Sequence, residues 1–115
     1  MKFKINNTQW EIKEISQKEI KTMLNKRRNN NSEDVESIDS RYYGVTFHDS
    51  CLICLDKDLP IGRKKTTLMH ELTHCYITTY ITHLDNEYSE EMVCDIVANS
   101  NGFINSIIKK YFKEV

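Results

Sequence analysis

The stretch 66–82, with the sequence TTLMHELTHCYITTYIT, constrains the fold more than any other part of the chain. Its apolar residues predict a largely apolar helix, and they are Leu68, Leu72, Cys75, Ile77 and Ile81. Within it His70 and His74 lie four residues apart, so both imidazoles are expected on one helix face, about one turn from each other. Both rings can then reach one point in space. The pattern therefore predicts a metal site, and two imidazoles suit zinc.

Glu71 directly follows the first histidine of this pair and lies about 100° round the helix from it. Its carboxylate is expected beside the metal, where it can act as a general base on a bound water. The segment His70-Glu71-Leu72-Thr73-His74 thus supplies two zinc ligands and a base, which favours hydrolysis. The alternative is an ordinary amphipathic helix whose polar residues face solvent.

A catalytic zinc ion commonly takes three protein ligands and a water, so a third ligand is expected downstream. We choose Glu91 because it begins a stripe on one face of a second predicted helix, formed by Glu91, Asp95, Ala98 and Gly102. The small residues of the stripe predict a close approach of the two helices, which would bring Glu91 to within about 2 Å of the metal. Asp95 is expected to orient a ligating histidine. Other candidates for the third ligand stay open, namely Asp95, Glu87, Glu90 and Cys94.

The predicted reaction also needs a donor that stabilises the oxyanion formed from the substrate carbonyl. Four residues qualify by type, and the sequence does not choose among His48, Tyr80, His83 and Tyr88. A second hypothesis uses the same zinc ligands without turnover, in a zinc-stabilised protein-interaction module. Glu71 favours the enzyme, because a structural zinc site has no need of a base.

The first part of the chain predicts a hairpin over residues 2–15, where apolar and polar residues alternate around an Asn-Asn turn. Ser16 and Glu19 form a capping box that starts a short helix. Residues 29–40 are polar and acidic, and we expect them to form a mobile loop.

A second strand pair is predicted over residues 42–47 and 51–55, immediately before the histidine-bearing helix. If the second of these strands is a sheet edge, an extended substrate could pair with it. Ser89 is a good N-cap for a final helix that runs to about residue 112. The expected fold is therefore α+β, a small sheet packed against the histidine-bearing helix and a C-terminal helix.

The length of 115 residues suits one domain, residues 1–115. The net charge is −1, and the basic residues are spread along the chain, so neither nucleic acid nor a membrane surface is expected as a partner. No apolar run approaches the roughly 18 residues of a membrane span, and the first residues do not resemble a signal peptide. We expect a cytoplasmic protein whose cysteines, Cys51, Cys54, Cys75 and Cys94, are reduced. A site made of these four sulfurs is a minor alternative.

The HELTH segment, followed after 16 residues by Glu-Met-Val-Cys-Asp, resembles the HExxH…ExxxD arrangement of gluzincin metallopeptidases. The strand and Leu-Pro turn before the helix, with the stretch that ends Val-Ala-Asn, are similar to the ImmA/IrrE family, and the likeness covers roughly residues 43–104. It implies a zincin-like endopeptidase that acts on a protein or peptide, with His70, His74 and Glu91 on zinc and Glu71 as base. Small stand-alone phage or prophage members are the most similar in layout.

Overall fold

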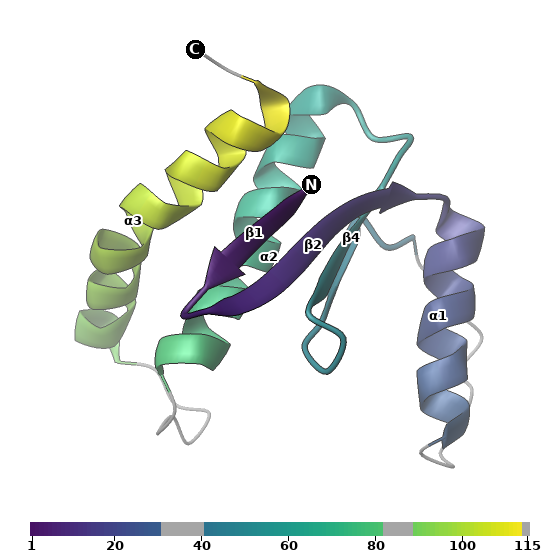
Figure 1. Cartoon of the computed structure of the whole chain (residues 1–115), viewed down its shortest axis with the longest axis horizontal. Coiled ribbons are helices and arrows are strands. Elements are labelled where there is room, and N and C mark those ends of the chain that lie inside the picture. Colours follow the sequence, from purple (N-terminus) through teal and green to yellow (C-terminus); the bar gives the residue numbers. More distant parts are fainter. Residues whose placement is uncertain (31–40, 82–88, 114–115) are drawn as a thin grey trace.

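The computed structural model describes residues 1–30, 41–81 and 89–113, and its fold is α+β, as the sequence predicts. Two strands are followed by a helix, two more strands and two helices (Figure 1). In chain order the elements are β1 (Lys2–Ile5), β2 (Thr8–Ile15), α1 (Gln17–Asn30), β3 (Gly44–Phe47), β4 (Leu52–Asp56), α2 (Ile61–Tyr80) and α3 (Glu90–Phe112).

The four strands form one mixed sheet in the order β1-β2-β4-β3. Strands β1 and β2 are antiparallel and joined through Asn6 and Asn7, whose positive φ angles of 48° and 67° fit a two-residue hairpin. Strands β3 and β4 form the second antiparallel pair, and β2 joins the two pairs by running parallel to β4. Both predicted hairpins are therefore confirmed.

The order of the strands answers a question that the sequence left open. An extended substrate could pair with β4, the strand before α2, only if β4 were a sheet edge, but β4 lies inside the sheet between β2 and β3. The edge on this side is β3, and β3 also contacts α2. The reason is the parallel pairing of β2 with β4, which brings together strands that are distant in sequence.

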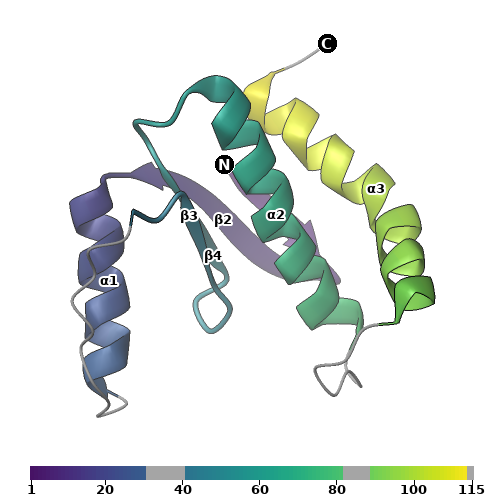
Figure 2. The same ribbon diagram turned by 180° about the vertical axis from the view of Figure 1, so that it is seen from behind.

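Helices cover both faces of the sheet. α2 and α3 lie side by side on one face, and α1 lies on the other near β3 and β4 (Figures 1 and 2). The larger core joins the first face to both helices, through Phe3, Ile5, Trp10, Ile12, Ile53, Leu55, Leu68, Leu72, Cys75, Ile104, Ile107 and Ile108. The smaller core lies under α1 and contains Ile20, Phe47 and Cys54. The alternation is complete in β4, which sends Ile53 and Leu55 into the larger core and Cys54 into the smaller one.

Helix boundaries follow the capping signals. The Ser16 Oγ accepts a hydrogen bond of 3.2 Å from the Glu19 N–H, which confirms the predicted capping box, and the Ser89 Oγ accepts one from the Met92 N–H. α1 continues to Asn30, so the predicted loop over residues 29–40 is wrong for its first two residues. Residues 31–40 of the predicted loop lie outside the described residues.

In the three described segments, every helix is either too short or too polar to cross a lipid bilayer.

Candidate metal centre

The two histidines of α2 lie side by side, as predicted. The Nε2 atoms of His70 and His74 are 3.1 Å apart. Two nitrogen ligands of one tetrahedral zinc ion, each about 2.0–2.1 Å from the metal, lie about 3.3 Å apart. The two imidazoles therefore have the separation that a shared zinc ion requires. Both side chains are exposed, 68% in the case of His70, so a substrate can reach them.

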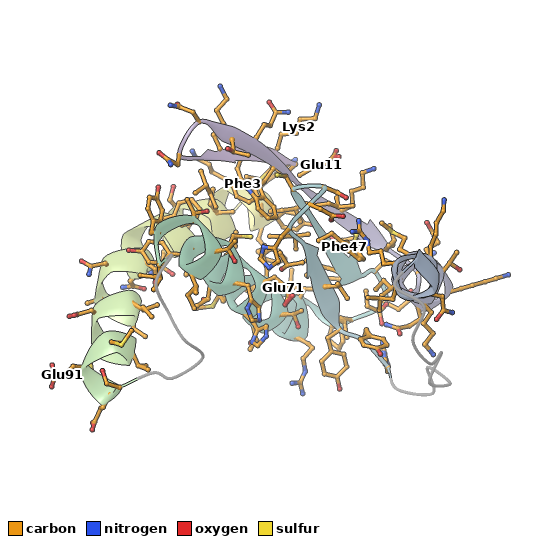
Figure 3. The ribbon with its side chains drawn as sticks, turned by 90° about the horizontal axis from the view of Figure 1, so that it is seen from below. Lys2, Phe3, Glu11, Phe47, Glu71 and Glu91 are labelled. Atoms are coloured by element: carbon orange, nitrogen blue, oxygen red, sulfur yellow. The ribbon has the colours of Figure 1, made fainter. Side chains whose placement is uncertain are left out.

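Glu71 differs from its two histidine neighbours because it is buried, with 5% of its surface exposed. Its carboxylate lies between α2 and β3 (Figure 3). The Oε2 atom is 3.8 Å from the Nε2 of His70, which is longer than the spacing of two ligands on one zinc ion. The carboxylate therefore lies next to the histidine pair, and the ligand atoms of all three residues lie within 4.8 Å of one another.

Thr46 on β3 holds the other oxygen of this carboxylate. Its hydroxyl donates a hydrogen bond of 3.1 Å to Oε1 of Glu71. A buried carboxylate needs such a partner, because burial removes the water that would otherwise solvate it. The edge strand therefore takes part in orienting the candidate base.

β3 reaches this position because Gly44 has no side chain. A Cβ built on Gly44 would lie 2.7 Å from the Cγ2 of Thr67 on α2, closer than real Cβ contacts allow. It would also lie 3.2 Å from the carbonyl oxygen of Cys54. The glycine therefore permits strand and helix to approach closely one turn before Glu71.

A cavity of about 330 Å³ opens beside His70 and Glu71. Its walls come from α2 and from the chain that leads into β3, and they consist of Arg41, Tyr42, Tyr43, Gly44, Arg63, Thr66, Thr67, His70 and Glu71. Its volume lies at the lower end of the range of ligand-binding pockets. The candidate base and one candidate ligand thus line a space that a substrate could enter.

The structure does not bring Glu91 to the histidines, which corrects the predicted third ligand. Within residues 1–30, 41–81 and 89–113, the only group of three metal-binding side chains is His70, Glu71 and His74, whose ligand atoms lie within 4.8 Å of one another. Glu91 is exposed at the far end of α3 and points away from Glu71 (Figure 3).

The packing of α3 explains this difference. Its buried residues are Ile96, Ser100, Ile104, Ile107 and Ile108. At about 100° per residue, this face lies roughly opposite the stripe that begins with Glu91. The predicted close approach at Gly102 is also wrong, since a Cβ on Gly102 would have no atom within 4 Å. The apolar face of α3 buries more surface, so this face packs against the core.

Asp95 is likewise separated from the histidines. It is exposed and lines a second hollow of about 140 Å³ near the other end of α2, with Tyr76 and Ile81. The predicted role of Asp95 in orienting a histidine has no support in this arrangement, and neither has ligation by Asp95, Glu90 or Cys94. Glu87, the remaining alternative, lies outside the described residues.

Neither described oxyanion candidate lines the cavity of Glu71. His48 lies on the turn between β3 and β4, where its ring meets Trp10 edge to face. Tyr80 packs against Tyr76 near the end of α2. His83 and Tyr88 lie outside the described residues. Tyr42 and Tyr43, which sequence reasoning did not select, line the cavity instead.

The cysteines are free thiols on different sides of the sheet. Cys54 belongs to the core under α1 and Cys75 to the core under α2 and α3, so the sheet separates them. Burial raises the pKa of the Cys54 thiol to about 11 and that of the Cys75 thiol to about 12. The minor alternative of a site made of four sulfurs is therefore wrong.

Sequence reasoning missed Thr46, Tyr43 and Arg63, all close to the candidate base or in its cavity. None of them stands at a spacing that marks a metal or catalytic motif. The available signal was weaker: residues 42–47 were predicted to pair with the strand before α2.

Comparisons with protein-family models, with curated proteins and with solved structures found no match to this chain.

Proposed function

We propose that this protein is a zinc-dependent metallopeptidase that hydrolyses peptide bonds of a polypeptide substrate in the cytoplasm. One observation carries the proposal: two exposed histidine nitrogens lie 3.1 Å apart beside the buried carboxylate of Glu71. His70 and His74 would hold the ion. The resemblance of the sequence pattern to ImmA/IrrE peptidases agrees with this function.

A zinc ion held by these histidines would supply Lewis-acid chemistry, which would polarise a carbonyl and lower the pKa of a water. Glu71 supplies the proton transfers. Its carboxylate takes a proton from the attacking water and later delivers that proton to the leaving amine. The hydrogen bond from Thr46 holds Oε1, which leaves Oε2 on the side of His70. The open surface around His70 supports a catalytic site, because structural zinc sites are closed by protein ligands.

The edge strand β3 is well placed to align an extended substrate. Its one pairing partner among the described strands is β4, so its other side keeps backbone donors and acceptors for a peptide. Thr46 lies on this strand and bonds to Glu71, so a peptide beside β3 runs past the candidate base. Such pairing gives affinity with little demand on side chains, and it suits a peptidase.

The test combines zinc content with cleavage of a fluorescein-labelled unfolded protein. Wild type is compared with His70→Ala, His74→Ala and Glu71→Gln, and with His48→Ala as a control histidine outside the cluster. The expected result is one zinc ion in wild type, in Glu71→Gln and in His48→Ala, and loss of zinc in the other two variants. Cleavage is expected to fall by at least about a hundredfold in Glu71→Gln, because the base is lost, and to persist in His48→Ala.

Glu91→Ala tests whether Glu91 is a zinc ligand, as the sequence pattern predicts. Glu91 lies away from the histidines, so this variant is expected to keep its zinc. Loss of zinc would show that α3 presents its acidic face to α2 when the metal is bound. Zinc binding without cleavage in wild type would favour the zinc-stabilised interaction module, and wild type without zinc would refute the proposal.

A further inference from the structure

Two arginines and a tyrosine line the cavity beside Glu71, and no part of the proposed reaction uses them. We propose that this arginine pocket, formed by Arg41, Tyr43 and Arg63, binds a carboxylate of the substrate polypeptide and so selects acidic substrates. The inference rests on the proposed peptidase function and names the substrate class of that site.

Both guanidinium groups lie over the ring of Tyr43. The Cζ of Arg63 is 5.2 Å from the ring centroid, and the Cζ of Arg41 is 5.9 Å from it. Cation–π contacts of this kind hold arginine side chains in place without neutralising their charge. The planar guanidinium is also the side chain best suited to paired hydrogen bonds with a carboxylate. The pocket therefore presents fixed donors to a substrate anion.

The two arginines differ in whether a carboxylate pairs with their charge. Arg41 forms an ion pair of 2.8 Å with Asp56, whose side chain is fully buried. Arg63 has no carboxylate within ion-pair distance among the described residues. It stands in the first turn of α2, which contains no acidic residue and whose cap makes no side-chain hydrogen bond. The helix dipole thus adds positive potential beside a free cation.

Distances along α2 give the position of the bound carboxylate. Arg63 precedes His70 by seven residues, which is about 10 Å along a helix axis at 1.5 Å per residue. An extended peptide advances about 3.3 Å per residue, so this distance corresponds to about three residues. β3 follows the same path, because Gly44 lies against Thr67 and Thr46 against Glu71. The carboxylate is therefore expected about three residues from the scissile bond.

The carboxylate could belong to an internal Glu or Asp, or to the C-terminus of the substrate. Three labelled twelve-residue peptides of otherwise identical, uncharged sequence separate these sources. One has a central Glu and an amidated end, one has Gln and an amidated end, and one has Gln and a free C-terminal carboxylate. Affinity is measured by fluorescence anisotropy with Glu71→Gln, which stops turnover, in the presence of zinc.

The matched variants, made in the same background, are Arg63→Gln and Lys109→Gln. Lys109 is an exposed cation of α3 that lines no part of this cavity. We expect at least one carboxylate peptide to bind about tenfold more tightly than the neutral peptide. Arg63→Gln is expected to abolish that preference, and Lys109→Gln to keep it. Arg63→Glu is further expected to reverse the preference toward a peptide with a central Lys.

Equal binding of the three peptides, or binding of none, would overturn the inference, and so would a preference that survives Arg63→Gln. Cleavage by wild type reports separately on the proposed function. If wild type cuts all three peptides equally well, the peptidase proposal is supported and the arginine pocket is refuted. If the preference for a carboxylate peptide depends on Arg63 while wild type neither holds zinc nor cuts, the arginine pocket is supported and the peptidase proposal is refuted.

Discussion

The hydroxyl of Thr46 on the edge strand β3 donates a hydrogen bond of 3.1 Å to the buried carboxylate of Glu71 on α2. This contact joins the strand that could align a substrate to the group that we propose as its general base. A shift of β3 relative to α2 would therefore break this contact and move the strand relative to the candidate base. The first two predictions test this junction.

Thr46→Val keeps the shape of the side chain and removes the donor to Glu71. We expect kcat to fall about tenfold, because the loss of one hydrogen bond to a charged group costs about 1–2 kcal/mol. KM and zinc content are expected to change little. Steady-state kinetics with the labelled substrate measure both constants. Thr22→Val is the control, since Thr22 lies on α1 and its hydroxyl donates to the Lys18 carbonyl. An equal loss of kcat in this control would contradict the assigned role.

Gly44→Ala is expected to lower the free energy of unfolding by about 1–3 kcal/mol, because the new methyl group would overlap the Cγ2 of Thr67. Thr67→Ser removes that methyl group, so the double variant should recover part of the loss. Urea unfolding of both single variants and the double variant gives the coupling energy. Additive effects of the two substitutions would show that the approach of β3 to α2 is looser than the structure indicates.

Gly102→Ala is the matched glycine control, and it is also a test in its own right. No atom would lie within 4 Å of the new Cβ, and the position is inside a helix. We expect the free energy of unfolding to rise by about 0.5–1 kcal/mol, since alanine is the better helix former. A destabilised variant would instead support the close helix approach that the sequence predicted at this position.

Asp56 joins the end of β4 to the start of α1. Burial by itself raises the pKa of this carboxyl, but hydrogen bonds from the Asp58 N–H, Gln17 and Arg41 outweigh burial and lower the pKa below its ordinary value. A lowered pKa in the folded state means that the ionised form stabilises the fold. This contribution is present above the unfolded-state pKa of about 3.9, and it is lost as the pH falls through the folded-state value.

Asp56→Asn is therefore expected to cost about 2 kcal/mol of unfolding free energy at pH 7. The difference from wild type should shrink as the pH falls below about 4, where the carboxyl of the unfolded chain takes up a proton, and it should disappear once the folded carboxyl is protonated as well. Urea titrations at several pH values measure it. Asp58→Asn, an exposed neighbour, is the control. A difference that stays constant down to low pH would argue against this ion pair.

Thiol reactivity tests the two cores. Because burial raises the pKa of Cys54 and of Cys75 to about 11 and 12, both are almost wholly protonated at pH 8. Iodoacetamide at pH 8 is expected to label the exposed Cys94 first, and to label the two buried cysteines only at the rate of unfolding. Peptide mass spectrometry over time distinguishes the sites. Labelling of Cys75 as fast as Cys94 would contradict the packing of α2 on the sheet.

Local patterns in the sequence determined most elements and half of the candidate site. Alternating apolar residues with an Asn-Asn turn were sufficient to predict the first hairpin. Serine caps were sufficient to predict where α1 and α3 begin. The spacing of His70 and His74 was sufficient for their shared face, because a helix repeats every 3.6 residues. In these cases the residues that interact are close in sequence.

Contacts between distant segments were decided only by the tertiary structure. The acidic stripe of α3 has the spacing of a helix face, yet the apolar face that begins at Ile96 packs instead, so Glu91 stays in solvent. The parallel pairing of β2 with β4 makes β3 the edge, and the missing side chain of Gly44 brings β3 to α2. Thr46 meets the site for that reason. Sequence spacing specifies which residues share a face, whereas the burial of the largest apolar surface decides which faces meet.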